Sequence, residues 1–244
     1  MEQLTSVNNP YIKSLVKLHD AKTRKEEKKF LVEGEHLVSE AYKSKYLDAI
    51  IYSDVKYQLD GVKNVYVNDA IIQKLSQTKT PQKVIGLCRF IENKSLKPKR
   101  FLLLDNIQDP GNLGTLLRSA LGFNIDKIYL GNGTVDIYNE KVVRASQGAI
   151  FHLDFEYDNL INVIKKLTSE GVTVYGTAVT NGIELDNIKI PEKFAIILGN
   201  EGSGINKEIL KLTKQNIYIK TNPKLESLNV AIAGSIILYH FSKK

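Results

Sequence analysis

The chain has 244 residues, of which 43% are hydrophobic, and it contains one cysteine and four histidines. This length and composition allow one large or two ordinary domains with packed cores. No apolar run approaches a membrane span, and the first segment, MEQLTSVNNPYIK, lacks the core of a signal peptide. A single cysteine excludes an intramolecular disulfide, and the histidines have no ligand spacing, so we expect a cytoplasmic protein without a metal.

The net charge of +7 is concentrated in the first part of the chain. Residues 1–100 contain 19 Lys and Arg against 12 Asp and Glu, whereas residues 101–244 contain 15 of each. A basic module joined to a neutral one is typical of a protein whose first part meets a polyanion. A solvated charged face would give the same count, so the charge alone leaves both interpretations open.

Predicted strands and helices alternate in the first 92 residues, which indicates a small α/β domain. A helix is expected after Asn9-Pro10, and KTRKEEKK at residues 22–29 reads as a charged helix end or surface loop. The expected strands are FLVEG (30–34), AIIYS (49–53), NVYVN (64–68) and KVIGLCRFI (83–91), the last with Cys88 buried; the expected helices are EHLVSEAYKS (35–44) and DAIIQKLSQ (69–77). Residues 93–100, basic and without an apolar pattern, are the predicted linker.

A strand, a glycine-containing elbow and a helix follow at residues 101–123, FLLLDNIQDPGNLGTLLRSALGF. The run 101–104 predicts a buried strand, and the helix can be capped by Asn112. Arg118 falls outside the apolar stripe of this helix. An amide and a guanidinium after a strand are typical of an α/β ligand site, although a plain cap and a solvated arginine would look the same.

The remainder again alternates between strands and helices, which predicts an α/β sheet with helices on both faces. The expected elements are a strand in DKIYLGNGT, a helix and then a strand in YNEKVVRASQGAIFHL, a helix at 159–168, strands at 173–179 and 195–199, a helix in NKEILKLT, a strand in IYIKT and a long apolar helix at 227–241.

The glycine cluster at residues 199–204 has the spacing G-x-x-G-x-G. This order is the reverse of the dinucleotide fingerprint, and no Gly-Lys-Ser/Thr follows, so a Rossmann dehydrogenase and a P-loop NTPase are both disfavoured. Three glycines could merely form a tight turn. Glu201 stands among them, however, where exposed backbone amides can approach a ligand.

Three separated motifs occur together in the second half of the chain: NLGTLLR (112–118), LGNEGSG (198–204) and ESLNVAIA (226–233). In this order and spacing the chain resembles the SpoU-type (TrmH-like) RNA 2′-O-ribose methyltransferases of the SPOUT superfamily. FLVEGEHLVSEA (30–41) is similar to the ribosomal-protein-like RNA-binding domain that many members carry. The resemblance implies a basic RNA-binding domain at 1–92, a linker at 93–100 and a catalytic α/β trefoil-knot domain at 101–244.

The resemblance also implies S-adenosyl-L-methionine as cofactor, held in a crevice formed by three knotted loops. The cofactor-binding positions carried over are Ala178, Gly199, Gly202, Ile219, Ser227 and Leu228. The chain departs from the family where Lys220-Thr221 replaces the usual Pro-Met. Loss of a proline loosens the loop that lines the adenine pocket, so cofactor affinity is the property most in question.

The catalytic positions carried over are Arg118, Asn112, Glu201, Ser227 and Asn229. Family proposals make the arginine a base, but a guanidinium is effectively always protonated. We therefore favour Arg118 as a positioner of phosphate or hydroxyl that stabilises developing negative charge, with Glu201 fixing it. The amides and Ser227 would hold the target nucleotide and shape the loops. The sequence does not decide between these two roles of the arginine.

The expected function is methyl transfer to a ribose 2′-hydroxyl in ribosomal RNA, with the same chemistry on transfer RNA as an alternative. A non-catalytic RNA- or ribosome-binding protein that kept the fold, and a methyltransferase acting on a base or small molecule, are further alternatives. The last helix is apolar around more than one stripe, and in the family it contributes to a two-fold interface. We thus expect a homodimer in which Arg118 serves the neighbouring subunit, with Ile237 on the exposed flank.

Overall fold

The computed structural model describes residues 2–92, 97–178 and 182–243. The chain forms two compact units, each built from two stretches of sequence. Unit 1 comprises Met1–Glu92 and Asp136–His152, and unit 2 comprises Asn93–Val135 and Leu153–Lys244. Most of the predicted linker, residues 93–96, lies outside the described residues. The domain limits at 92 and 101 stay a prediction.

Unit 1 contains a mixed five-stranded sheet in the order β1-β4-β3-β5-β2. Strand β4 runs parallel to β1 and β3, whereas β5 is antiparallel to β3 and β2. The predicted elements of this half are confirmed, with Cys88 fully buried in β5. The elements are β1 (Glu2–Leu4), α1 (Pro10–Lys17), α2 (Ala21–Glu27), β2 (Lys29–Glu33), α3 (Glu35–Lys43), β3 (Leu47–Tyr52), η1 (Val55–Tyr57), β4 (Lys63–Val67), α4 (Asp69–Leu75) and β5 (Val84–Arg89).

The segment KTRKEEKK is more than the surface feature that its charges suggest. Arg24 in α2 is 5% exposed, and its Nη1 donates to the carbonyl oxygens of Leu18 and His19 at 2.8 Å each. Its Nε and Nη2 donate to Oδ2 of Asp136 at 3.0 and 2.6 Å. A buried guanidinium with a carboxylate partner and two carbonyl acceptors meets the requirement for burying charge. This ion pair ties the second stretch of unit 1 to the first.

Aromatic packing also holds that second stretch, which contains α6 (Glu140–Ser146) and the 3-10 helix η2 (Ala149–His152). The ring of Tyr138 stacks on Phe90 at 3.8 Å between centroids and lies 4.7 Å from Phe30. Phe151 stacks on Phe30 at 6.1 Å. The helix predicted from YNEKVVRAS is confirmed. The strand expected later in the same segment is wrong, because AIFH forms the 3-10 helix η2 and the next strand, β8, begins at Phe155.

Unit 2 contains a seven-stranded sheet in the order β10-β12-β9-β11-β6-β7-β8, and every neighbouring pair in it is parallel. The strand that comes last in the chain, β12, lies between two earlier ones. The strands are β6 (Arg100–Leu104), β7 (Lys127–Leu130), β8 (Phe155–Tyr157), β9 (Thr173–Thr177), β10 (Ile183–Glu184), β11 (Phe194–Leu198) and β12 (Gln215–Tyr218). Val179, predicted to end the strand at 173–179, lies outside the described residues.

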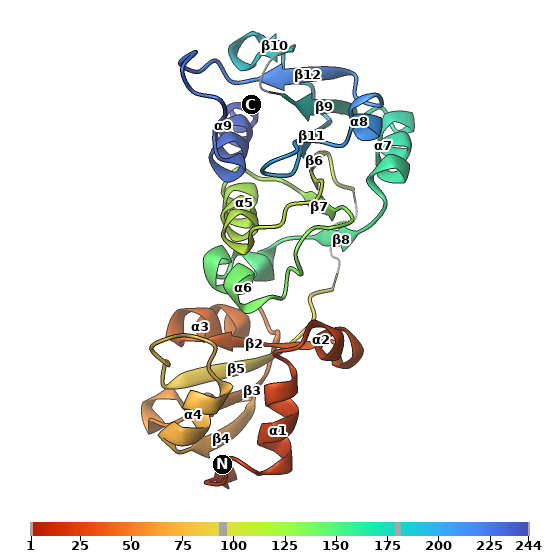
Figure 1. Cartoon of the computed structure of the whole chain (residues 1–244). Helices are drawn as coiled ribbons and strands as arrows, with labels where there is room; N and C mark the ends of the chain where they lie inside the picture. Colours follow the sequence, from red (N-terminus) through yellow and green to blue (C-terminus); the bar gives the residue numbers. More distant parts are fainter. Residues whose placement is uncertain (1, 93–96, 179–181, 244) are drawn as a thin grey trace. The chain divides into compact units, whose positions relative to one another are not determined.

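Helices cover both faces of this sheet, as predicted (Figure 1). α7 (Leu160–Ser169) and α8 (Lys207–Leu210) pack on one face, where Leu103 and Ile197 belong to their core cluster. α5 (Pro110–Gly122) and α9 (Val230–Ser242) pack on the other, and a side chain at Gly234 of α9 would clash with Leu116 and Leu198. The short 3-10 helix η3 (Leu185–Asn187) follows β10.

The start of each long helix differs from expectation by a few residues. α5 is capped by Asp109, whose Oδ1 accepts from the backbone N–H of Asn112 at 2.7 Å, so Asn112 is not the cap. Pro110 follows at the first helical position, where its missing N–H costs nothing. α9 begins at Val230 and is capped by Asn229. Ser227 therefore precedes the helix, and the Asn112 amide is free for other contacts.

Candidate active site at the carboxyl edge of the parallel sheet

Three of the expected cofactor positions come directly after three neighbouring strands. Ala178 follows β9, Gly199 follows β11 and Ile219 follows β12. β9 pairs with both other strands in parallel, so their carboxyl ends meet at one edge. Ligands of open α/β sheets bind outside this edge. The residues after Ala178 that continue the first expected loop, 179–181, lie outside the described residues.

The glycine loop after β11 closes on itself. Asn200 and Gly204 exchange backbone hydrogen bonds of 3.0 Å in both directions, and the Asn200 side-chain oxygen accepts from the N–H groups of Gly202 and Ser203 at 3.0 Å. A Cβ at Gly199 would overlap with the backbone of Gly204 and Ile205. Gly204 adopts φ +70, a conformation that L side chains rarely adopt. The glycines therefore build a tight loop that presents Glu201 at its tip.

Glu201 connects this loop to the start of α5. Its Oε1 accepts from the backbone N–H of Asp109 and from Nδ2 of Asn112, both at 3.1 Å. Its Oε2 accepts from the Gln108 N–H and from Nδ2 of Asn200, both at 3.3 Å. Burial raises the pKa of Glu201, but hydrogen bonds from the Asn112 side chain and from backbone N–H groups outweigh it, so the pKa lies below its ordinary value. The ionised Glu201 thus holds the glycine loop against the start of α5, and we call Glu201, its hydrogen-bond partner Asn112 and Asn229, to which Asn112 is bonded in turn, the bracket.

Asn112 extends the bracket to the last helix. Its Oδ1 accepts from Nδ2 of Asn229 at 2.9 Å, while its own Nδ2 donates to Glu201. Oδ1 of Asn229 accepts from the first N–H groups of α9. One chain of hydrogen bonds therefore joins α5, the glycine loop and α9, and three of the five expected catalytic residues lie in it.

Arg118 and Ser227 are not part of this chain of hydrogen bonds. Both are exposed, and neither side chain has a hydrogen bond or ion pair with any residue of the described ranges. Arg118 lies six residues after Asn112 in α5, so at about 100° per residue it points roughly 120° away from that amide. The expected contact between Arg118 and Glu201 is therefore absent within the described part of a single chain.

The expected cofactor positions have the chemistry that an adenosyl group needs. Ala178, Ile219 and Leu228 are apolar and half-buried, and the first two directly follow β9 and β12. The Ala178 N–H is already used by the Ile217 carbonyl at 3.0 Å, so that backbone is fixed. Apolar walls with a few fixed polar backbone groups are usual in cofactor sites. Lys220, at the position that departs from the family, lies 3.8 Å from Glu184 of β10, an exposed ion pair that can partly restrain the loop.

An apolar strip lies across α5 and α9, next to the bracket. Leu121 of α5 is exposed, as are Ile232, Ile236 and Tyr239 of α9, with exposed fractions between 37% and 53%. Ser119 and Ser235 share a hydrogen bond of 2.6 Å where the helices touch. Ile237 is 2% exposed, so the sequence-based expectation that it forms the exposed flank is wrong. Apolar residues occupy more than one stripe of α9, and for this reason the periodicity of the sequence does not tell which stripe faces the sheet.

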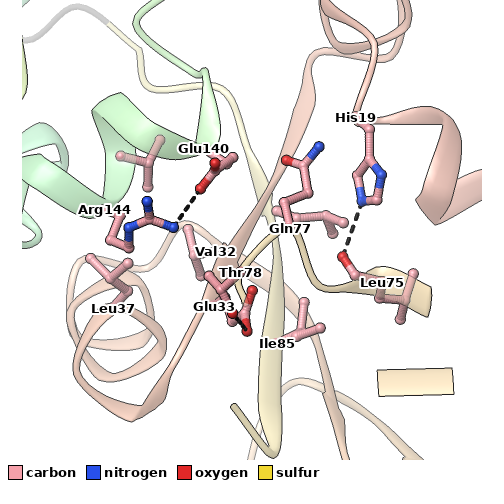
Figure 2. A pocket seen from close by; sticks show the side chains of 12 residues that line it. His19, Val32, Glu33, Leu37, Leu75, Gln77, Thr78, Ile85, Glu140 and Arg144 are labelled. Atoms are coloured by element: carbon pink, nitrogen blue, oxygen red, sulfur yellow. Dashed lines mark hydrogen bonds and ion pairs between the residues drawn. The ribbon is translucent and has the colours of Figure 1, made fainter. Parts of the chain in front are cut away.

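Unit 1 contains a polar site of its own around Glu33 (Figure 2). Ser76 Oγ and Thr78 Oγ1 donate to its carboxylate at 2.8 Å, and the Gln82 N–H donates at 2.9 Å. Glu33 thereby fixes the loop between α4 and β5. The cavity beside it, about 30 Å³, has room for little more than water. A larger open hollow of about 760 Å³ adjoins the same loop and is lined in part by His36, Lys79, Lys141, Arg144 and Gln147.

Sequence reasoning missed Asn200, Asp109 and Glu33, which all fix loops rather than face a ligand. Asp109-Pro110 carried a usable signal, because an aspartate before a proline is a frequent helix start. Among the described residues, no helix is long and apolar enough to span a membrane. The same residues include no group of three or more His, Cys, Asp or Glu that could hold a metal ion.

Comparison with known proteins agrees with this geometry over almost the whole chain. The sequence model of the SpoU rRNA Methylase family matches residues 99–239, and that of the MRM3-like substrate binding domain matches residues 9–86. The chain is 38% identical over 245 residues to the 23S rRNA (guanosine(2553)-2'-O)-methyltransferase RlmP of Bacillus subtilis, covering 98% of this chain and 99% of that protein.

Solved structures give the same result. An rRNA methyltransferase of Sinorhizobium meliloti with bound AdoMet superimposes with a TM-score of 0.88 at 26% identity, covering 98% of this chain and 97% of that one. A TrmH-family protein from Porphyromonas gingivalis has a TM-score of 0.86 at 29% identity, covering 97% and 98%. The fold is thus the expected α/β SPOUT class, with S-adenosylmethionine as cofactor. The chain belongs to the SpoU rRNA methylase family.

Proposed function

We propose that this protein transfers a methyl group from S-adenosylmethionine to the 2′-hydroxyl of a guanosine in large-subunit ribosomal RNA, in the cytoplasm. Family membership supports the methyl transfer, and the Bacillus subtilis relative is named for this chemistry at a guanosine of 23S rRNA. The observation that carries the proposal is that the bracket holds together the loops at the expected cofactor edge. Glu201, Asn112 and Asn229 connect the loops at the edge where the three expected cofactor positions meet.

S-adenosylmethionine would supply an electrophilic methyl carbon on a sulfonium. For this transfer the protein would have to align the 2′-hydroxyl with the methyl carbon, let the hydroxyl proton pass to water and stabilise the negative charge that develops on the oxygen. Arg118 has an exposed guanidinium without a partner among the described residues, which suits it to hold a phosphate or the 2′-oxygen. The bracket residues keep the loops in place, and exposed Ser227 can donate to the nucleotide.

We propose further that the enzyme is a homodimer formed through the apolar strip of α5 and α9. Such a strip is typical of an interface, and a two-fold axis beside α5 would let Arg118 act at the neighbouring subunit's bracket. Mixing inactive Arg118→Ala and Glu201→Ala subunits tests this. Random exchange makes half of the dimers mixed, each with one intact site, so about a quarter of wild-type activity should return. No recovery after verified exchange would show that Arg118 acts within its own subunit.

Unit 1 is proposed to bind the RNA, with the Glu33-fixed loop and the adjoining hollow at its surface. The match to a substrate-binding domain supports this. Lys79 and Lys141 can meet phosphates there, whereas Arg144 is already paired with Glu140 at 2.8 Å. Unit 1 has 17 basic against 14 acidic residues, and residues 93–100 add four basic residues without an acid. The excess charge is therefore shared between unit 1 and the predicted linker.

The decisive experiment is methylation of defined RNA. Purified protein, labelled S-adenosylmethionine and unmodified large-subunit rRNA should yield a single 2′-O-methylguanosine, located by mass spectrometry of nuclease fragments. Unmodified transfer RNA serves as the parallel substrate. Label only in transfer RNA would redirect the substrate assignment, label on a base would exclude ribose chemistry, and binding of rRNA without any methyl transfer would indicate a non-catalytic relative.

A further inference from the structure

An open polar hollow lies along the carboxyl edge of the unit 2 sheet, beyond the ends of β6 and β7. Its volume is about 780 Å³, within the range of small-molecule sites. Helices α7 and α8 contribute their first residues to it. The residues that line it include Asp105, Asn106, Asn132, Asn159, Asn206 and Lys207.

The carboxylate of Asp105 is the unusual group in this hollow. Asp105 comes directly after β6 and is only 8% exposed. Its Oδ2 accepts from the Asn206 N–H at 2.8 Å, but its Oδ1 has no hydrogen-bond partner among the described residues. Oδ1 is not completely buried, and Asp105 is one of the residues that line the hollow, so Oδ1 is the carboxylate oxygen available to a ligand there. A largely buried carboxylate oxygen without a protein donor is suited to accept from a ligand.

The amides around Asp105 supply the complementary groups. The side-chain oxygens of Asn159 and Asn206 are occupied in capping α7 and α8, so their NH2 groups remain as donors. Asn132 is exposed and has no hydrogen bond within the described ranges. Lys207 likewise has no ion pair with a described residue and can meet a phosphate at the rim. The hollow therefore combines the open oxygen of Asp105 with several amide donors and one cation. The second carboxylate in its lining, Glu208, is paired with Lys211 at 2.7 Å.

We propose that this hollow is a guanine-reading subsite, with Asp105 accepting from the base. Guanine alone among the four RNA bases places two adjacent N–H donors, N1–H and N2–H2, beside an acceptor edge of O6 and N7. The open Oδ1 of Asp105 has two lone pairs and can accept from both donors, and neighbouring amide NH2 groups match the acceptors. Uracil, cytosine and adenine each offer a single donor group, so they leave part of this set unsatisfied.

The subsite adjoins the proposed active site, and the inference rests on the RNA methyltransferase function proposed above. Nδ2 of Asn200 donates to the Asn106 carbonyl oxygen at 2.9 Å, and Ser203 and Gly204 of the glycine loop line the hollow. The loop that presents Glu201 is thus also a wall of the subsite. A guanosine of the RNA held here would be positioned relative to the cofactor edge by shared backbone.

Nucleotide titration followed by backbone amide NMR tests the subsite in the full-length protein. Guanosine 5′-monophosphate should shift the resonances of Asn106, Asn132 and Asn206. Inosine 5′-monophosphate, which lacks the N2 amino group, should bind at least fivefold more weakly. Adenosine, cytidine and uridine monophosphates at equal concentration should leave these resonances in place. Equal shifts with all nucleotides, no shift with the guanosine nucleotide, or the same shifts with Mg²⁺ alone would overturn the proposal.

The variant Asp105→Asn separates recognition from folding. Asparagine can still accept from the Asn206 N–H but presents an amide donor to the base, so affinity for the guanosine nucleotide should fall at least tenfold. Asp126→Asn, at the opposite edge of the sheet, removes the same charge and should have no effect. S-adenosylmethionine binding, measured separately by calorimetry, should be unchanged in both variants. If the wild type did not bind S-adenosylmethionine, the proposed function would be refuted. If Asp105→Asn bound the guanosine nucleotide as tightly as the wild type, the subsite would be refuted.

Discussion

Two carboxylates stand at the same edge of the unit 2 sheet and differ in how far the protein has already satisfied them. Both oxygens of Glu201 accept two hydrogen bonds each, from two loops and the start of α5. Asp105 has one oxygen bonded and the other open to a hollow. A carboxylate that accepts four internal hydrogen bonds has little capacity left for a ligand, so its role is to stabilise the loops that it connects. One with an open oxygen is available for recognition.

The same distinction separates the other site residues. Asn112 and Asn229 are occupied by each other and by the bracket, whereas Arg118 has no partner among the described residues. Residues of the first kind should affect stability and cofactor binding together when they are changed. Residues of the second kind should affect turnover or RNA recognition and leave the folded chain as it was. Each of the following experiments challenges this division.

Replacing Arg118 by alanine should have the largest effect on turnover and almost none on stability. Loss of a positioned cation that stabilises developing charge typically lowers the rate by about 10²- to 10³-fold. Because the exposed Arg118 side chain has no hydrogen bond or ion pair within the described chain, the melting temperature and the cofactor affinity should stay close to wild type. Single-turnover methylation, calorimetry and thermal melting measure the three quantities. Thr115→Ala, one turn earlier on α5, is the matched control, and normal turnover of Arg118→Ala would contradict the role.

A charge on the apolar strip should produce monomers with little activity, if Arg118 serves the partner subunit. Ile232→Glu places a carboxylate on the exposed side of α9, and burying it in an interface would cost several kcal/mol. Light scattering should then report about half the wild-type mass. Tyr157→Glu introduces the same charge at an exposed aromatic position on β8 and should leave assembly intact. A monomeric and fully active Ile232→Glu enzyme would show that Arg118 does not have to act at the site of a partner subunit.

Removing the bracket charge should lower stability and cofactor binding moderately and together. In Glu201→Gln the amide can accept through only one oxygen, and its NH2 group faces donors, so we expect a loss of about 1 to 2 kcal/mol. For a chain of this size that corresponds to a fall in melting temperature of roughly 2 to 8 °C. Glu208→Gln removes a charge from an exposed ion pair with Lys211 and should change neither property. An unaltered cofactor affinity in Glu201→Gln would contradict the role of Glu201 in holding the cofactor loops.

Apolar periodicity, which is a local signal, was sufficient for the α/β class and for most elements, whereas the SPOUT fold was predicted only from the family resemblance. The resemblance also brought together Asn112, Glu201 and Asn229. Three features depend on distant contacts and have no local signal. They are the burial of Arg24 by Asp136, the open oxygen of Asp105 and the face of α9 that carries Ile237. A charged segment reads as surface until its partner is known.

The smallest expected effect is the pH dependence of the bracket. Because the folded-state pKa of Glu201 is lowered, its ionised form contributes stability that is present above the unfolded value of about 4.3 and is lost as pH falls through the lower folded value. The difference in melting temperature between wild type and Glu201→Gln should therefore be constant from about pH 8 to pH 5 and shrink only under more acid conditions. Thermal melts of both proteins across this range measure it. If the difference in melting temperature disappeared already near neutral pH, Glu201 would be protonated more easily than a carboxylate that accepts four hydrogen bonds should be. The bracket would then stabilise the protein less than its hydrogen bonds indicate.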